Sequence, residues 1–190
     1  MRIIAGSRKG HTIHAPKGLD TRPTSDRVRE NVFNIVAPWV EGARVLDLYA
    51  GSGAMGLEAL SRGAEAAVFV EADPEAVRAI ERNLDKLRLT GARVVRGDAT
   101  TGLAHETGAG RKYDLVLADP PYDMTDYSVL SRYLPRVLAD DGLLVFETAA
   151  RTEPELEKLA VRTSRKYGRT RVTVFEHSSR LSGVAGKGAK

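Results

Sequence analysis

Residues 47–56 read Asp-Leu-Tyr-Ala-Gly-Ser-Gly-Ala-Met-Gly, and this stretch decides the fold. Residues 44–49 predict a buried strand, and residues 54–61 predict a helix. The glycines between them let the backbone turn sharply and approach a ligand closely. Amide groups at the start of the helix then face that ligand. Residues 51–56 also match the G-x-G-x-x-G dinucleotide pattern, and Glu71 lies 20 residues after Gly51. An α/β fold that binds a nucleotide-like cofactor is therefore expected.

Asp47 distinguishes between the cofactors that such a loop can bind. It lies at the predicted strand end, directly before the glycines. A carboxylate there would repel the pyrophosphate of a nicotinamide or flavin cofactor. It would attract a cofactor that carries an ammonium and a sulfonium, such as S-adenosylmethionine (AdoMet). Asp47 therefore favours AdoMet. The competing interpretation is that Asp47 is only a cap or turn residue near the loop.

Residues 119–122 form a second motif, Asp-Pro-Pro-Tyr, after the apolar residues 113–118. The apolar run predicts a buried strand, which two consecutive prolines must end because they fix φ and remove two backbone donors. The resulting corner offers the Asp119 carboxylate, the Pro120 carbonyl and the Tyr122 ring. Two acceptors beside a ring suit the amino group of a flat base or amide. A plain turn after a strand is the competing interpretation.

Strands and helices alternate from residue 44 onward, which predicts a mostly parallel sheet with helices on both faces. The expected strands are 44–49, 66–71, 92–96, 113–118 and 142–147, and the expected helices are 54–62, 74–89 and 126–138. Residues 159–166 and 170–177 predict a closing hairpin around Gly168. Before the sheet, residues 3–5 and 12–14 predict a short hairpin. A helix capped by Thr24 or Ser25 is expected to follow and to end at Pro38.

Four carboxylates follow predicted strand ends: Asp47, Glu71, Asp98 and Asp119. Ligands of open parallel sheets bind at the carboxyl ends of the strands, so these groups are expected along one rim. Glu71 can accept both ribose hydroxyls of a cofactor, and Asp98 with Ala99 can accept from its adenine amino group. We expect the cofactor site to consist of Asp47, Gly51, Ser52, Gly53, Glu71, Asp98, Ala99 and Asp119. Glu71 and Asp98 also have simpler interpretations, as a helix charge and a turn residue.

The order of these motifs resembles class I AdoMet-dependent methyltransferases that act on exocyclic nitrogens. Two other stretches narrow the resemblance. Residues 1–10 read Met-Arg-Ile-Ile-Ala-Gly-Ser-Arg-Lys-Gly, and residues 21–30 read Thr-Arg-Pro-Thr-Ser-Asp-Arg-Val-Arg-Glu, followed by Val32-Phe33-Asn34. These stretches look like the RsmD family, which methylates N2 of one guanine in bacterial 16S ribosomal RNA. The resemblance extends to about residue 180.

The resemblance implies a Rossmann-like, mostly parallel seven-stranded sheet, AdoMet as cofactor and 16S rRNA in the small ribosomal subunit as partner. Asp119 and Pro120 would accept the hydrogens of the guanine amino group, and Tyr122 would stack on the base. The expected catalytic residues are thus Asp119, Pro120 and Tyr122. The base must be flipped or already unpaired to reach this corner.

Other functions stay open at this point. A DNA adenine-N6 methyltransferase uses the same corner, but such enzymes usually need a target-recognition domain for which the chain has no room. A protein glutamine methyltransferase favours Asn at the position of Asp119. A nicotinamide-dependent oxidoreductase would need a substrate domain and a hydride-transfer residue. A non-catalytic RNA-binding module would be repelled by the four carboxylates.

Charge is distributed unevenly along the chain. Residues 1–30 carry a net charge of +4, residues 31–150 carry −6, and residues 151–190 carry +6. Basic ends around an acidic centre suggest a catalytic core between segments that bind a polyanion. Arg22, Thr24, Asp26 and Arg29 lie in the stretch that resembles RsmD, which can face the RNA. The expected RNA contacts are Arg8, Lys9, Arg22, Arg29, Arg165, Lys166 and Arg169, with Arg171 as a further candidate.

Composition limits the remaining possibilities. The 190 residues contain no cysteine, which excludes disulfides, thiolate zinc sites and a cysteine nucleophile. The four histidines are scattered, so no metal site is expected. No apolar run is long enough to span a membrane, and we expect a cytoplasmic monomer. We expect residues 1–40 to form an N-terminal extension over RNA and cofactor, residues 41–180 the methyltransferase domain, and residues 181–190 a loose tail.

Overall fold

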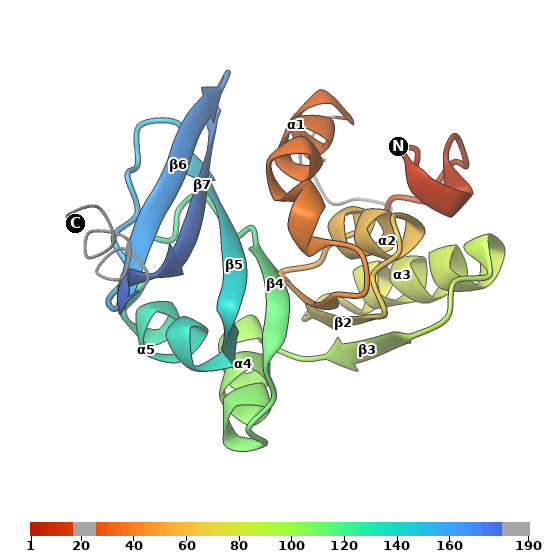
Figure 1. The fold of residues 1–190 in the computed structure, drawn as a ribbon. Coiled ribbons are helices and arrows are strands. Elements are labelled where there is room, and N and C mark those ends of the chain that lie inside the picture. Colours follow the sequence, from red (N-terminus) through yellow and green to blue (C-terminus); the bar gives the residue numbers. More distant parts are fainter. Residues whose placement is uncertain (17–25, 180–190) are drawn as a thin grey trace, which may run out of the picture.

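A computed structural model of the chain describes residues 1–16 and 26–179. These residues form a seven-stranded sheet in the order β3-β2-β1-β4-β5-β7-β6 (Figure 1). Strands β1 to β5 pair in parallel, whereas β7 pairs antiparallel with β5 and β6. The strand order reverses between β1 and β4, and a ligand crevice is expected beyond the carboxyl ends of strands at such a point.

The sheet agrees closely with the predicted strands. Its members are β1 (Arg44–Leu48), β2 (Ala66–Glu71), β3 (Ala92–Arg96), β4 (Tyr113–Ala118), β5 (Leu138–Ala149), β6 (Leu159–Tyr167) and β7 (Thr170–His177). Strands of a parallel sheet are buried on both faces and appear in the sequence as continuous apolar runs. The runs that predicted β2 and β4 therefore matched the bounds of these strands, and the predicted bounds of the edge strand β3 also agree.

Helices cover both faces of the sheet. They are α1 (Asp26–Val36), α2 (Ala54–Ser61), α3 (Pro74–Leu87), α4 (Ala99–Gly108) and α5 (Ser128–Val137), with two short 3-10 helices, η1 (Gly6–Arg8) and η2 (Ala37–Trp39). One buried cluster joins α1, α2 and α3 to the face that carries Val45 and Leu117. A second cluster joins α4 and α5 to the face that carries Leu46 and Val116. None of these helices is long and apolar enough to cross a membrane.

Two elements differ from the prediction. Helix α4 was missed because three of its first four residues, Thr100, Thr101 and Gly102, have low helix propensity. It forms because Asp98 caps its N-terminus and Leu103 is buried against the sheet. Strand β5 begins at Leu138, four residues before the predicted start, and α5 is correspondingly shorter than predicted. The early part of β5 pairs with Tyr113, and that pairing is not visible in the local sequence.

The N-terminal segment packs onto α2. Arg2 and Thr12 form an antiparallel bridge, so the predicted hairpin is reduced to a single bridge around η1. The Ser61 hydroxyl donates to the Ala5 carbonyl at 2.7 Å and accepts from the Arg8 amide at 3.0 Å. A Cβ at Gly6 would lie only 1.8 Å from the Ser61 carbonyl oxygen, so glycine is required at this close approach. Thr24 and Ser25, the predicted caps of α1, lie outside the described residues.

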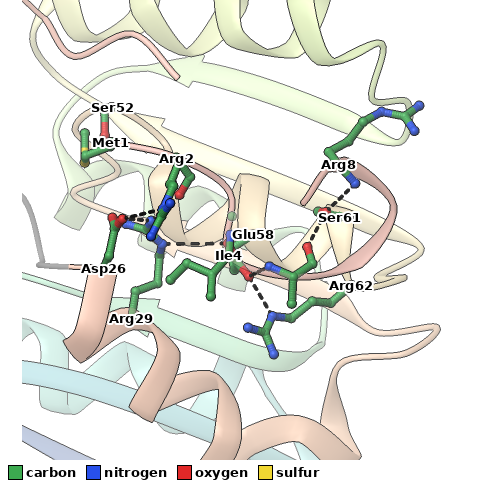
Figure 2. A network of polar contacts seen from close by, with 12 residues as sticks. Met1, Arg2, Ile4, Arg8, Asp26, Arg29, Ser52, Glu58, Ser61 and Arg62 are labelled. Carbon is green, nitrogen blue, oxygen red and sulfur yellow. Dashed lines mark hydrogen bonds and ion pairs between the residues drawn. The ribbon is translucent and has the colours of Figure 1, made fainter. Parts of the chain in front are cut away.

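A buried ion-pair network fixes the same segment to α1 and α2 (Figure 2). Glu58, fully buried, accepts hydrogen bonds from the amides of Ile4 at 2.8 Å and Ala5 at 2.9 Å. It also pairs with Arg62 at 2.8 Å and with Arg29 at 3.8 Å. The predicted RNA contact Arg29 is therefore wrong, because this side chain is fully buried and bound within the protein.

Candidate active site

Asp47 lies beneath the glycine loop, near the end of the central strand β1. Its side chain is buried and accepts a hydrogen bond from the Gly56 amide at 2.9 Å. A Cβ on Gly56 would lie 2.3 Å from the Phe69 ring and 3.1 Å from the Asp47 carboxylate. The carboxylate therefore reaches the start of α2 only because residue 56 is glycine.

The ionisation of Asp47 depends strongly on its surroundings. Burial raises the pKa of Asp47 to about 8. The hydrogen bond from Gly56 opposes this shift, and the nearby charge of Glu71 adds to it. These surroundings favour the protonated form of Asp47 more than water does. A cation bound beside it would favour the carboxylate form.

Glu71 ends β2 and shapes the cofactor loop. One carboxylate oxygen accepts from the Gly51 amide at 2.6 Å, and the other accepts from the Asp73 amide at 2.9 Å. Glu71 therefore lies beside the glycine loop, where the sequence predicted it. In this ligand-free structure each of its oxygens is already bonded to a backbone amide. A ribose would have to share or displace those bonds.

The glycine loop is also connected to the N-terminal segment. Asn83 of α3, fully buried, donates to the carbonyls of Ser52 at 3.2 Å and His14 at 3.0 Å. Its own side-chain oxygen accepts from the His14 amide at 2.7 Å. Ser52, a predicted cofactor residue, is thus linked through one asparagine to the start of the chain.

Asp98 follows β3 and caps α4. Its carboxylate accepts from the amides of Thr100 at 2.9 Å and Thr101 at 3.2 Å, and from the Thr100 hydroxyl. The hydroxyl contact is the main reason why the pKa of Asp98 lies below its usual value. Ala99 is buried in the core, so only its backbone is available to a ligand. These cap hydrogen bonds do not use every acceptor position of the Asp98 carboxylate. Asp98 can therefore cap α4 and still accept a hydrogen bond from a ligand.

Tyr49 contributes a feature that the sequence did not indicate. It has a φ of 59°, which is strained for a residue other than glycine. Its hydroxyl is buried and has no hydrogen-bond partner among residues 1–16 and 26–179. Burial, with a smaller effect from the charge of Asp98, raises the pKa of Tyr49 to about 12. An unpaired donor beside Asp98 is a free hydrogen-bonding position at the predicted adenine end of the site.

Asp119 stands at the predicted amino-acceptor corner. It follows Ala118, which pairs with Leu48 of β1 and Phe146 of β5, so the corner adjoins the glycine-loop strand. Asp119 is partly buried, and Pro120 is buried. Burial first, then the charges of Glu147 and Asp47, hold the pKa of Asp119 well above its usual range.

The ring of Tyr122 is exposed, whereas its hydroxyl is held by two contacts. Its side chain is 46% exposed, so the ring is open to a stacking partner. Its hydroxyl lies 3.1 Å from the Glu147 carboxylate and 2.7 Å from the Thr170 hydroxyl. Sequence reasoning missed both anchors. Glu147 ends an apolar run in the same way as Glu71, and that signal was available, whereas Thr170 gives none.

Arg169 of the β6–β7 turn lies near this corner, and Arg165 and Lys166 precede it on β6. Arg165, Lys166 and Arg169 are exposed. The Arg169 carbonyl accepts from the Ala150 amide at 2.8 Å, and the next residue is Thr170, which contacts Tyr122. The turn thus places Arg169 beside the predicted base pocket.

Other predicted RNA contacts have different surroundings. Arg171 is buried and bonded to Ser164 and Glu153, so its candidacy is wrong. Arg8 donates to the Leu87 carbonyl at the far end of α3, about 20 Å along that helix from the rim. Arg8 nevertheless lines an open basic hollow of about 420 Å³ with His11, Lys86, Leu87 and Arg88. Lys9 is exposed, and Arg22 lies outside the described residues.

No group of three or more metal-ligating side chains occurs within the described ranges 1–16 and 26–179.

Comparison with known proteins identifies the family. The family model described as Conserved hypothetical protein 95 matches residues 1–176. The Escherichia coli (strain K12) protein named ribosomal RNA small subunit methyltransferase D is 39% identical over 157 residues, which cover 83% of this chain and 76% of that protein. The chain belongs to the RsmD family.

Two other similarities extend over nearly the whole length of this RsmD-family chain. YlbH of Bacillus subtilis (strain 168) is 39% identical over 181 residues, which cover 93% of this chain and 98% of YlbH. The solved structure of yhhF from Escherichia coli matches with a TM-score of 0.83 at 34% identity, covering 93% of this chain and 97% of yhhF. The predicted RsmD resemblance and the Rossmann-like α/β fold are confirmed.

Proposed function

We propose that this chain transfers a methyl group from AdoMet to the exocyclic N2 of one guanine in 16S rRNA, in the assembled small subunit. The observation that carries the proposal is the position of the Asp119–Tyr122 corner on β4, directly beside the Asp47 strand and its glycine loop. An amino-group acceptor and a cation site are thus neighbours at one strand-order reversal. The Escherichia coli relative named as a small subunit rRNA methyltransferase supports the substrate class.

AdoMet suits the residues on the cofactor side. Gly56 leaves space that a Cβ would fill, so that Asp47 reaches the helix start. The unpaired Tyr49 hydroxyl and the Asp98 carboxylate supply a donor and an acceptor at the far end. Asp47 would face the positive end of the cofactor, and Glu71 the ribose. When bound, AdoMet supplies a methyl group on a sulfonium, which is already an excellent leaving group.

On the base side, the protein's main task is orientation. The lone pair of the guanine amino nitrogen is delocalised into the ring and donates poorly. Asp119 and the Pro120 carbonyl would accept its two hydrogens, which localises the lone pair and aims it across the rim. Asp119 would also stabilise the positive charge that develops on the nitrogen. Tyr122 would stack on the base, which contributes roughly 1–3 kcal/mol.

Cofactor affinity should depend on pH through Asp47. With its pKa at about 8 in the free protein, a cation can bind the carboxylate form only after a proton leaves. The affinity for AdoMet should therefore rise from pH 6 to 8, by up to about tenfold per unit, and level off above pH 8. Calorimetry in buffers of different ionisation enthalpy would detect the released proton.

The control for this prediction is Asp47→Asn, which should bind AdoMet weakly and without this pH dependence. S-adenosylhomocysteine, NAD and NADP provide the comparison of cofactors. Binding of NAD in preference to AdoMet, or an AdoMet affinity that is flat from pH 6 to 9 in the unmodified protein, would contradict the assignment.

The β6–β7 turn should bind RNA phosphates. Replacing Arg165, Lys166 and Arg169 together with glutamine should weaken RNA binding and flatten its salt dependence. Removing one phosphate interaction should reduce the slope of log affinity against log salt by roughly 0.7–0.9. The matched control is Arg132→Gln with Arg136→Gln on α5, which covers the other face of the sheet. If the slope of the triple variant stays unchanged, these side chains are only solvated. Lys9→Gln tests the other basic region separately.

The substrate should be the prefolded particle. A base that is already splayed out in a fixed shape supplies selectivity for one guanine and avoids the cost of unstacking it from a helix. Small subunits from a strain lacking the enzyme should be methylated faster than the same RNA without protein. Mass analysis of nucleosides should find one new N2-methylguanosine. Equal or faster transfer to bare RNA would refute the particle as substrate, and a different methylated nucleoside would refute the guanine assignment.

A further inference from the structure

Glu147 and Asp119 occupy equivalent positions on neighbouring strands. Ala118 of β4 pairs with Phe146 of β5, so the next residue on each strand is a carboxylate. Because side chains alternate along a strand, Glu147 points to the face that carries Leu117, opposite to Phe146. Asp47 points to the same face from β1, where it is level with Leu117. Asp119 directly follows the end of β4 and is close enough for the charges of Glu147 and Asp47 to affect its pKa. Three adjacent strands thus bring carboxylates to one place.

Tyr122 connects this carboxylate group to the last strand. Its hydroxyl lies 3.1 Å from the Glu147 carboxylate and 2.7 Å from the Thr170 hydroxyl of β7. Glu147 is 8% exposed and Thr170 is 7% exposed, so both partners are fixed by packing while the Tyr122 ring stays open. Two hydrogen-bonding contacts at the end of a side chain restrict its rotation far more than one does.

We propose that Glu147 and Thr170 are positioning residues for methyl transfer, which hold the Tyr122 ring in the plane where the target base stacks. This inference rests on the proposed function, because it concerns the same base. It assigns the rim of β5 and β7 to the base pocket, in addition to the Asp-Pro-Pro-Tyr corner. Neither residue touches the amino group in this assignment.

Glu147 has a second, electrostatic effect at the same place. Its charge, after burial, raises the pKa of Asp119, and the charge of Asp47 acts in the same direction. From the other packed elements, β7 contributes the uncharged Thr170, and Arg171 points to the opposite face with its partner Glu153. Helix α1 contributes Arg29, which is engaged with Asp26 and Glu58. The amino acceptor is therefore active only when Asp119 ionises against two nearby carboxylates.

Three variants separate the two effects. Glu147→Gln keeps an oxygen that accepts from Tyr122 but removes the charge. Because removal of a like charge lowers the pKa of Asp119, the acid limb of the pH–rate profile should move to lower pH by roughly one unit. The KM for the RNA substrate should stay within about twofold. Glu147→Ala and Thr170→Val each remove a hydrogen-bonding partner of Tyr122 and should raise that KM by roughly 2–10-fold.

Thr173→Val is the matched control, because it makes the same chemical change on β7 but on the opposite face. The positioning role would be overturned if Thr170→Val behaved like Thr173→Val. An unmoved pH profile in Glu147→Gln would overturn the electrostatic effect of Glu147 on Asp119.

A second measurement does not depend on catalysis. NMR of ¹³C-labelled tyrosine, assigned with Tyr122→Phe, should show that Glu147→Ala shifts the Tyr122 ring signal whereas Thr173→Val does not. An unmoved signal would overturn the inference itself. A shifted signal in a protein that transfers no methyl group to RNA would instead mean that the contact exists and the proposed function is wrong.

Discussion

Asp119→Ala is expected to abolish methyl transfer and to leave cofactor binding nearly intact. The carboxylate is needed only where the amino group lies, so the rate of a single turnover should fall by at least about 100-fold, the usual cost of removing one electrostatic contact to the transition state. The affinity for AdoMet, measured by calorimetry, should change by no more than a few-fold. Asp119→Asn keeps an acceptor without a charge. Its single-turnover rate should lie between the rates of Asp119→Ala and of the unmodified protein.

Asp123→Ala is the control for this prediction, because Asp123 is an exposed carboxylate in the same loop. Asp123→Ala should retain both methyl transfer and AdoMet binding. Near-normal turnover in Asp119→Ala would mean that the amino group is held elsewhere. Loss of AdoMet affinity together with turnover would instead assign Asp119 mainly to the cofactor.

Arg29→Ala should be the most destabilising exchange of an arginine in α1. It leaves Glu58 buried without one of its cationic partners, and it removes the donor to the Arg2 carbonyl. Breaking a buried ion pair typically costs about 3–5 kcal/mol of unfolding free energy. Urea denaturation would measure the decrease.

Arg27→Ala, two positions earlier on the exposed side of α1, should change the unfolding free energy by no more than about 0.5 kcal/mol. If both variants were destabilised equally little, the buried network would not stabilise the N-terminal segment. The salt dependence of RNA binding by folded Arg29→Ala should match that of the unmodified protein, because Arg29 makes no contact with solvent.

The features predicted best from the sequence were those that depend on a local pattern of residues. Apolar runs with an acidic residue at or near the carboxyl end identified β1, β2 and β4 together with Asp47, Glu71 and Asp119. Helix α4 was not predicted because capping and burial outweigh the weak propensity of its first turn. Such effects depend on the neighbours that the fold provides.

The predictions that Arg29 and Arg171 contact RNA were wrong for a different reason. A basic residue in a basic segment is normally solvated, and only a distant partner reverses this expectation. For Arg29 that partner is Glu58, on another helix. Tyr122 was predicted as a stacking ring, but its two anchors belong to strands that the chain reaches 25 and 48 residues later.

The position of β7 between β5 and β6 also sets an order of assembly. The glycine loop and the carboxylates Asp47, Glu71 and Asp98 all come from the first 98 residues, and β1, β2 and β3 pair with near neighbours in the chain. The base pocket is completed only when Thr170 inserts beside β5, after almost the whole chain has been made. A nascent chain emerges from its N-terminus and its early parts fold first. During synthesis the proposed cofactor-binding half of this protein thus forms before the proposed base-binding half, which stays incomplete until β7, the last of the described strands in the chain, has joined the sheet.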